Sequence, residues 1–254
     1  STSMLVTSTV TAKEITIAGF NYKPFLHMNS PTEASGIVND IVNAAFSEVG
    51  FKTNYRMYPF PRAVAALLNA NTDAGFFDPS TLETVTKKKH LCSVFFQYNA
   101  VLFYTKKNSR FENINLKEKL VGVLRGNNFE VSALKSKGMK VESVHNHASL
   151  FKMLSLSRID FASTVDLTGF STIKENFRED QWEQFKIVKE PYYKGKAGLC
   201  FSGKNAILNQ ATFLKGLNLI RDKGIFKKIV KKYLSKNLYK DIDQYYQEYW
   251  DGIN

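Results

Sequence analysis

The sequence predicts an α/β protein built from two units of similar plan. Apolar runs of strand type alternate with segments of helical periodicity along most of its 254 residues, and this alternation is typical of parallel sheets covered by helices. The order β-α-β-α-β occurs twice, first over residues 14–77 and again over 120–166. The chain is long enough for one large domain or two domains of ordinary size, and the repeated order favours two.

The first unit opens with a strand over 14–18 ("EITIA"), which leads into a loop. In the helix 37–49 that follows, apolar residues fall on one face, and Gly50 is a typical stop signal. "KTNYRMY" is expected to form the second strand. The next helix contains "PRAVAALLN", where Pro61 suits a first turn because its missing N–H has no partner at that position. "DAGFF", at 73–77, completes the unit as a buried strand.

The second unit repeats this plan. Its Leu154 and Asp160 have the same spacing as Leu67 and Asp73 in the first unit, with the Asp opening the third strand in both. The expected elements are a strand over 120–126, a helix begun by Asn127 or Asn128 and ended by Gly138, a strand over 140–145, a helix over 148–157 and a strand over 158–166.

Two further strands connect the units and predict a hinge. "YNAVLFY", at 98–104, leads into the second unit, and "KAGLCFS" leads out of it. The first domain is therefore expected to be discontinuous, over 13–103 and 199–254, with the second domain inserted at 104–198.

Helices are expected in the last third of the sequence. The first ends at Gly224 and precedes "IFKKIVKKYL" and a Tyr-rich tail, "YKDIDQYYQEYW". The apolar positions of that first helix are Ile207, Leu208, Ala211, Leu214, Leu217 and Ile220.

Charge and cysteine content narrow the functional classes. A net charge of +12 invites a nucleic-acid interpretation, but the lysines are spread thinly, without an Arg-rich arm, zinc-finger spacing or an RNP-type strand. We expect a Lys-rich solvated surface, no nucleic-acid partner and no cofactor. No apolar run reaches the length of a membrane span. Cys92 and Cys200 can pair in an exported protein, but both lie in apolar strand-like runs, so two separate buried thiols are expected.

Residues 1–12 ("STSMLVTSTVTA") are uncharged and lack periodicity. Their end, Val10-Thr11-Ala12, is similar to the small-residue cleavage site of a secretory signal peptide, but the apolar and basic regions of a full signal are absent. A signal remnant and a frayed terminus are both compatible with this segment.

Several landmarks occur in an order that matches a known family. They are "NYKPFL", "SGIVNDIVNAAF", "LLNANTDAGF", "LVGVLRGNN", "LSRIDFASTVD" and "IRDKGIFKKIVKKY". Each is weak alone, but their common order is specific. Over residues 14–233 the chain resembles the bacterial family 3 extracellular solute-binding proteins, the periplasmic components of amino-acid-type ABC transporters.

The resemblance implies a two-lobed, periplasmic-binding-protein-like (type II) fold with a hinge of two crossing strands. It also implies a periplasmic location and delivery of a small ligand to a membrane permease. Because the acids of the sequence lack a recognisable catalytic partner, we expect binding without catalysis. Ligands of open α/β sheets sit beyond the carboxyl ends of the strands. Tyr22 and Phe60 match the positions where family members stack rings on the ligand. Arg62 would lie at the same rim, and Phe77 and Asp78 would line the floor.

The sequence departs from the family where the ligand's charged groups are bound. A lysine replaces the arginine that clamps the ligand's carboxylate, and lysine cannot make the bidentate contact. The second-lobe turn carries Asn127 and Asn128 in place of Ser or Thr, and Asp166 lies about one residue from the family's amine-binding acid. The lysine candidates are Lys87, which is nearest, Lys88 and Lys89.

Each candidate also has a purely structural interpretation. Tyr22 and Phe60 suit loop packing, and Arg62 suits a solvated helix start. Asp78 suits a turn before a proline, and Asp166 suits a helix cap.

Three functions are compatible with the sequence. The first is a binding module for transport, the second an enzyme on the same fold, and the third a sensory module for a membrane kinase. Asp78 and Asp166 have no His or Cys partner at a recognised catalytic spacing, and the His145–His147 pair has no further metal ligand. We expect a monomer that closes on a small polar, amine-bearing or amino-acid-like solute, with a neutral or acidic ligand as the alternative. The expected ligand-binding residues are Tyr22, Phe60, Arg62, Phe77, Asp78, Lys87, Asn127, Asn128 and Asp166.

Overall fold

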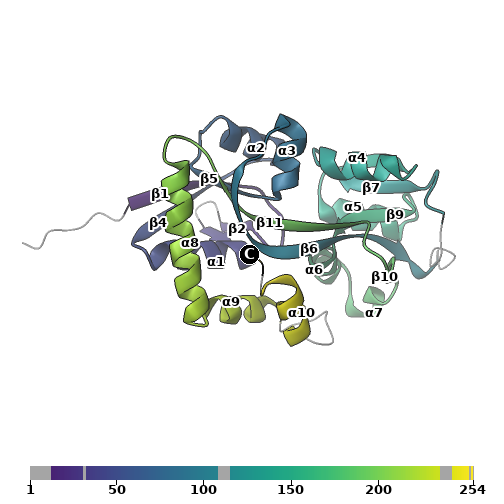
Figure 1. The fold of residues 1–254 in the computed structure, drawn as a ribbon. Coiled ribbons are helices and arrows are strands. Elements are labelled where there is room, and N and C mark those ends of the chain that lie inside the picture. Colours follow the sequence, from purple (N-terminus) through teal and green to yellow (C-terminus); the bar gives the residue numbers. More distant parts are fainter. Residues whose placement is uncertain (1–12, 31–32, 108–114, 235–241, 252, 254) are drawn as a thin grey trace, which may run out of the picture.

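Two long strands join two lobes in the computed structural model, which describes residues 13–30, 33–107, 115–234, 242–251 and 253. The strands β6 (Leu91–Thr105) and β11 (Tyr193–Phe201) pair antiparallel and run between the lobes (Figure 1). In the described part of the chain, the main sheet has the order β4-β1-β5-β11-β6-β9-β7-β8, and β10 pairs with β6. The predicted segment 1–12 lies outside the described residues.

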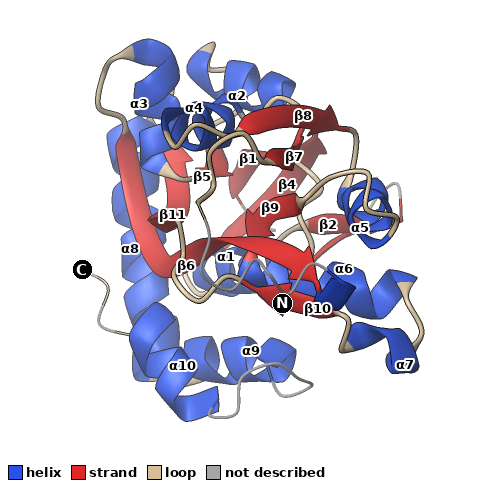
Figure 2. Ribbon diagram, turned by 90° about the vertical axis from the view of Figure 1, so that its right-hand side faces the viewer, coloured by secondary structure: helices blue, strands red, loops and turns tan. Residues whose placement is uncertain are grey.

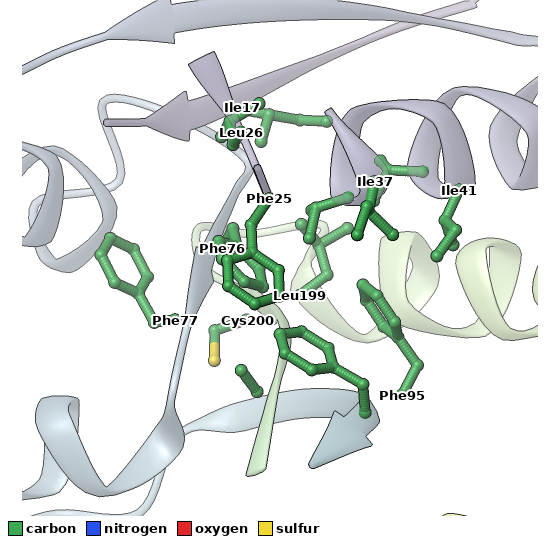
Figure 3. Packing of buried hydrophobic residues seen from close by; sticks show 14 of the residues in the cluster. Ile17, Phe25, Leu26, Ile37, Ile41, Phe76, Phe77, Phe95, Leu199 and Cys200 are labelled. Carbon is green, nitrogen blue, oxygen red and sulfur yellow. The ribbon is translucent and has the colours of Figure 1, made fainter. Parts of the chain in front are cut away.

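The first lobe carries parallel strands β1, β4 and β5, with helices on both sides (Figure 1). Its core joins these strands to α1, α8 and α9, as the close packing of Phe25, Ile41, Phe76 and Leu199 shows (Figure 3). Its elements are β1 (Lys13–Gly19), β2 (His27–Ser30), β3 (Glu33–Ser35), α1 (Ile37–Ser47), β4 (Phe51–Met57), α2 (Phe60–Leu68), β5 (Ala74–Phe77), α3 (Pro79–Thr86), α8 (Ala206–Asp222), α9 (Ile225–Leu234) and α10 (Ile242–Tyr249).

The second lobe carries parallel strands β7, β8 and β9, seen end-on in Figure 2. Leu150 and Ile173 pack on one face of these strands, from α5 and α6, and Leu134 of α4 packs on the other. Its elements are β7 (Leu120–Leu124), α4 (Asn128–Ser136), β8 (Lys140–Val144), α5 (His147–Ser155), β9 (Phe161–Val165), α6 (Asp166–Asn176), α7 (Glu179–Trp182) and β10 (Phe185–Ile187). The two predicted β-α-β-α-β units are thus present.

Some elements were not predicted from the sequence. The loop after β1 contains the β2–β3 hairpin, and α3 follows β5 directly. The Tyr-rich tail forms α10, whose Tyr245 and Tyr246 are buried in the first-lobe core. Trp250, at the end of α10, stacks on Phe96 of β6 with 4.6 Å between ring centroids. The tail therefore belongs to the fold and covers one of the hinge strands.

The buried face of α8 differs from the predicted apolar set. Leu217 and Ile220 are buried as expected, but Ile207 is 78% exposed and Leu208 is 63% exposed. The helix instead packs through Gly216, where an added Cβ would lie 1.9 Å from the carbonyl oxygen of Ala45 in α1. This close approach of two backbones sets which face is covered, and the apolar pattern alone does not reveal it.

The prediction of two separate thiols is wrong, because Cys92 and Cys200 form a disulfide. The antiparallel register of β6 and β11 places these residues directly opposite each other. They are separated by 108 positions in the sequence, so the strand pattern around each cysteine gave no sign of the other. The disulfide ties the two hinge strands together on their first-lobe side.

Candidate ligand-binding pocket

A pocket lies between the lobes at the carboxyl ends of three strands. Phe20 follows β1, Phe77 and Asp78 end β5, and Val165 ends β9, and all four line the pocket. The hinge strands contribute Tyr98 and Tyr193. The pocket opens to solvent, and both lobes and the hinge strands contribute to its lining.

Asp78 is the acid of the first-lobe wall, and four hydrogen bonds hold its carboxylate. Oδ1 accepts the backbone N–H of Ser80 at 2.8 Å and the Ser80 hydroxyl at 2.6 Å. Oδ2 accepts the hydroxyls of Tyr98 at 2.6 Å and Tyr193 at 3.2 Å. Burial, together with the Asp78 charge, raises the pKa of Tyr98, so this phenol remains a donor. The contact with Ser80 also caps α3.

Aromatic rings form most of the remaining wall. Phe20 packs edge-on against Phe60 with 4.8 Å between centroids, and nearly parallel to Phe77 at 5.8 Å. From the second lobe, Phe129 of α4 meets Tyr193 edge-on at 4.7 Å. Phe77 is fully buried, whereas Phe60, Phe129 and Tyr193 are half-buried. The half-buried rings are therefore the ones best placed to contact a ligand.

Glu130 is the acid of the second-lobe wall. It lines the pocket but is only 6% exposed. One carboxylate oxygen accepts the hydroxyl of Ser163 at 3.1 Å, and that hydroxyl lies 2.7 Å from the hydroxyl of Tyr192. Burial raises the pKa of Glu130 to about 7. This acid therefore retains its proton to a higher pH than a typical surface carboxyl group does.

A second polar chain crosses from one lobe to the other. The Tyr22 hydroxyl lies 3.3 Å from Thr164 Oγ1, which lies 3.1 Å from Nε2 of His147. The rings of Tyr22 and His147 pack edge-on at 5.0 Å. Burial lowers the pKa of His147 to about 4, so the imidazole is neutral at pH 7. Tyr22 thus reaches both the pocket and the opposite lobe.

The lobes also meet at the rim of the pocket. Lys23 and Glu175 form an ion pair at 3.1 Å. An added Cβ on Gly126 would lie 2.6 Å from Cγ of Pro61, so the turn before α4 touches the start of α2. These contacts place the two walls face to face.

The structure brings several of the predicted site residues together. Tyr22, Phe60, Phe77, Asp78 and Asn127 all line the pocket. Asn127 also caps α4, because its Oδ1 accepts the N–H of Glu130 at 3.2 Å.

The other predicted residues lie outside the pocket lining. Arg62 is exposed on α2, and 87–89, the lysine candidates, are exposed at the C-terminal end of α3, whereas the pocket touches the N-terminal end of that helix. Asn128 is exposed beside a neighbouring groove. Asp166 is buried at the start of α6, where it accepts the N–H of Leu167 at 2.7 Å.

Sequence reasoning missed several residues of the pocket. They are Phe20, Tyr98, Phe129, Glu130 and Tyr193. A usable signal existed for the tyrosines, because each lies in or beside a segment already expected to form a hinge strand. Phe129 and Glu130 follow the turn that the sequence marked as ligand-binding, so the first helical turn after it was worth including.

Metal binding and membrane insertion have no support in the described residues. No group of three or more His, Cys, Asp or Glu side chains there could hold a metal ion. Within the same ranges, no helix has the length and apolar character needed to cross a bilayer.

Comparison with known proteins bears on the fold. A curated arginine-binding periplasmic protein from Mannheimia haemolytica is 23% identical over 227 residues, covering 89% of this chain and 93% of that protein. The solved substrate-binding protein of an amino-acid ABC transporter superposes with a TM-score of 0.70 at 20% identity, over 88% of this chain and all of that one (100%). This chain has the two-lobed solute-binding-protein fold. The predicted resemblance to the periplasmic binding proteins of amino-acid transporters is confirmed at the level of this fold.

A sensor of related architecture is equally similar in shape. A histidine kinase sensor domain with similarity to periplasmic binding proteins gives a TM-score of 0.73 at 17% identity, over 87% of this chain and 96% of that domain. No family model matches the sequence. These similar proteins are named for binding or sensing, and at such identities they show the fold alone.

Proposed function

We propose that this protein captures a small amine-bearing or amino-acid-like solute between its lobes and presents it to the permease of an ABC transporter. The observation that supports this proposal most directly is the set of partners of Asp78, the acid of the first-lobe wall. The Asp78 carboxylate accepts hydroxyl and backbone N–H donors, and no basic side chain forms an ion pair with it in the described part of the chain. A cationic group on a ligand would supply the missing charge. The arginine-binding and amino-acid-transport relatives support this class.

We propose binding without chemistry, on a monomer whose lobes close around the ligand. The acceptor positions of the Asp78 carboxylate are occupied by hydroxyl donors and a backbone N–H, which supports a role in binding. The buried core is split into one cluster in the first lobe and two in the second, which supports the proposed division into 13–103 with 199–254 and 104–198. Near the boundaries the packing departs from it, because Val101, Leu102 and Phe103 pack in the second-lobe clusters and Ala197 packs in the first-lobe cluster.

A periplasmic location is part of the proposal. The periplasmic relative supports it, and so does the disulfide between Cys92 and Cys200, because disulfides persist in oxidising compartments.

Mass spectrometry of the solute that co-purifies with the protein tests the proposal, followed by calorimetry on a panel of amino acids and amines. We expect a nitrogen-bearing solute, and weaker binding after Asp78→Asn. A ligand without nitrogen, or unchanged affinity in this variant, would contradict the amine assignment. Scattering in solution should show a smaller radius with saturating ligand.

A sensory role is the second candidate, favoured by the similarity to a kinase sensor domain. The two roles differ in the protein that receives the loaded form. Uptake of the labelled solute into cells that lack this protein separates them, since a transport component is needed for uptake and a sensor component is not.

A further inference from the structure

We propose that the ligand's cationic group is an alkylated ammonium, with methyl or methylene groups where a primary amine has N–H donors. This inference rests on the proposed capture of a cationic solute and narrows its chemical class. It depends on three properties of the pocket: the occupied acceptors of its half-buried acid Asp78, the aromatic rings in the lining, and the absence of basic side chains from that lining.

The acceptors of Asp78 are already occupied. A carboxylate offers about four lone-pair sites, and the Asp78 carboxylate receives four hydrogen bonds, two from Ser80 and one each from Tyr98 and Tyr193. A primary ammonium brings three donors that need acceptors, and burying them without partners is unfavourable. An alkylated ammonium has few or no donors, so it benefits from the negative charge of Asp78 without displacing any of these bonds.

The rings of the pocket match such a group. Phe60 and Tyr22 come from the first lobe, Phe129 comes from the second, and Tyr193 belongs to a hinge strand. All four line the pocket, and none of them is fully buried. Aromatic rings attract cations through their quadrupole, and enclosure by several rings is a known way to bind quaternary ammonium groups.

The charge of the pocket is opposite to that of the whole chain. The protein carries a net charge of +12, but the described lining holds Asp78 and Glu130 and no Lys, Arg or His. The lysines at 87–89, predicted as candidates for the carboxylate clamp, and Arg62, predicted at the rim, lie outside the lining. A cation is therefore favoured inside the pocket, and no basic side chain there is available to hold a ligand carboxylate.

Titration calorimetry with matched probes tests the inference. The probes are choline, its uncharged isostere 3,3-dimethylbutan-1-ol, and ethanolamine, which keeps the hydroxyl and charge but has a primary amine. We expect choline to bind at least about tenfold more tightly than either of the others. Arginine is included because its guanidinium group is a flat cation rich in donors.

Variants locate the binding in this pocket. Phe60→Leu keeps an apolar side chain and is expected to weaken choline binding about 3- to 30-fold, with Phe51→Leu as the control for loss of a ring outside the pocket. Asp78→Asn is expected to weaken choline binding and leave the neutral isostere unchanged. Asp40→Asn is its control, because Asp40 also accepts a tyrosine hydroxyl, that of Tyr233 at 2.8 Å, outside the pocket.

The outcomes distinguish this inference from the proposal on which it rests. Tighter binding of ethanolamine, arginine or another amino acid than of choline would overturn the alkylated-ammonium assignment and leave solute capture intact. If no probe or amino acid binds and no solute co-purifies, both are overturned. Choline binding that survives Phe60→Leu and Asp78→Asn unchanged would also overturn the assignment.

Discussion

The two walls of the pocket are built in different ways. The first-lobe wall is an extension of the lobe's core, because Phe20 and Phe77 line the pocket and also belong to the buried cluster of that lobe. Figure 3 shows Phe77 within this cluster. The second-lobe wall is formed by the first turn of α4, with Glu130 held by Ser163 behind it. A change in the shape of the first-lobe wall is therefore expected to change the stability of the fold. The polarity of the second-lobe wall is expected to change with the protonation of Glu130.

The largest expected effect on stability comes from a substitution in the first-lobe wall, because its rings also belong to the core. Phe77→Ala removes a fully buried ring and should lower the free energy of unfolding by about 3–5 kcal/mol. Phe129→Ala, on the opposite wall, removes a half-buried ring and should mainly weaken ligand binding. Denaturant titration of both variants measures the difference. Equal losses of stability would show that the two walls are built alike.

The disulfide is a further difference between the two lobes. It joins the only two cysteines of the sequence, which lie on the first-lobe side of the hinge strands. Replacing both by alanine should lower the free energy of unfolding by about 2–4 kcal/mol, chiefly by releasing the unfolded chain from a long closed loop. Thermal unfolding of the double variant, with the reduced parent protein as a second control, measures the change. A melting temperature equal to that of the oxidised parent would contradict it.

The pH dependence of the free energy of unfolding should report on the second-lobe wall, because Glu130 is part of it. The pKa of Glu130 is raised from 4.5 to about 7, so between these values the folded chain holds a proton that the unfolded chain has lost. Its contribution therefore makes the free energy of unfolding fall as pH rises through this window. The pKa of His147 is lowered from 6.5 to about 4, which makes stability fall as pH drops through that range. The two slopes oppose each other between about 4.5 and 6.5.

The Glu130→Gln substitution should leave only the contribution of His147 to the pH dependence of the free energy of unfolding. The variant should lose stability only on acidification below about pH 6.5, and at pH 7.5 it should be more stable than the parent by roughly 2–3 kcal/mol. Denaturant titrations from pH 4 to 8 measure this, with Glu142→Gln, an exposed acid on β8, as the control. A pH profile identical to the parent's would show that Glu130 is ionised normally.

The smallest effect is expected at the rim, where the walls meet through the Lys23–Glu175 ion pair. Both side chains are 47% exposed, so solvent screens their attraction and the pair should contribute less than about 1 kcal/mol. Lys23→Met should leave ligand affinity within about fivefold of the parent's value, because each 1.4 kcal/mol changes affinity tenfold. A larger loss in calorimetry would show that the rim, and not the walls, holds the lobes closed.

The sequence predicted the features that depend on a short local pattern of residues. The two β-α-β-α-β units, the cap at Asn127, and the placement of Phe60 and Asp78 at ends of elements all followed from spacing and turn chemistry. The disulfide, the burial of Trp250 and the hydrogen bonds from Tyr98 and Tyr193 to Asp78 depend on pairing between segments far apart in the chain. Strand register and helix docking bring those segments together, and neither is encoded in a single segment.

The predicted lysine clamp is a second case in which a local sequence pattern was not sufficient. The alignment with the family placed it at 87–89, beyond the end of α3. Because α3 continues directly from β5 and Asp78 caps it, the helix carries these residues away from the pocket. A motif fixes the order of residues along the chain, but the length of the intervening helix decides where they lie.

Hydrogen–deuterium exchange with and without the solute found by mass spectrometry tests the central claim most directly. If the ligand is captured between the two walls, binding should slow exchange together in the segments 20–26 and 58–65 of the first lobe and 126–132 of the second. Protection confined to one lobe, or appearing only on α8 or α9 away from the pocket, would contradict capture between the lobes.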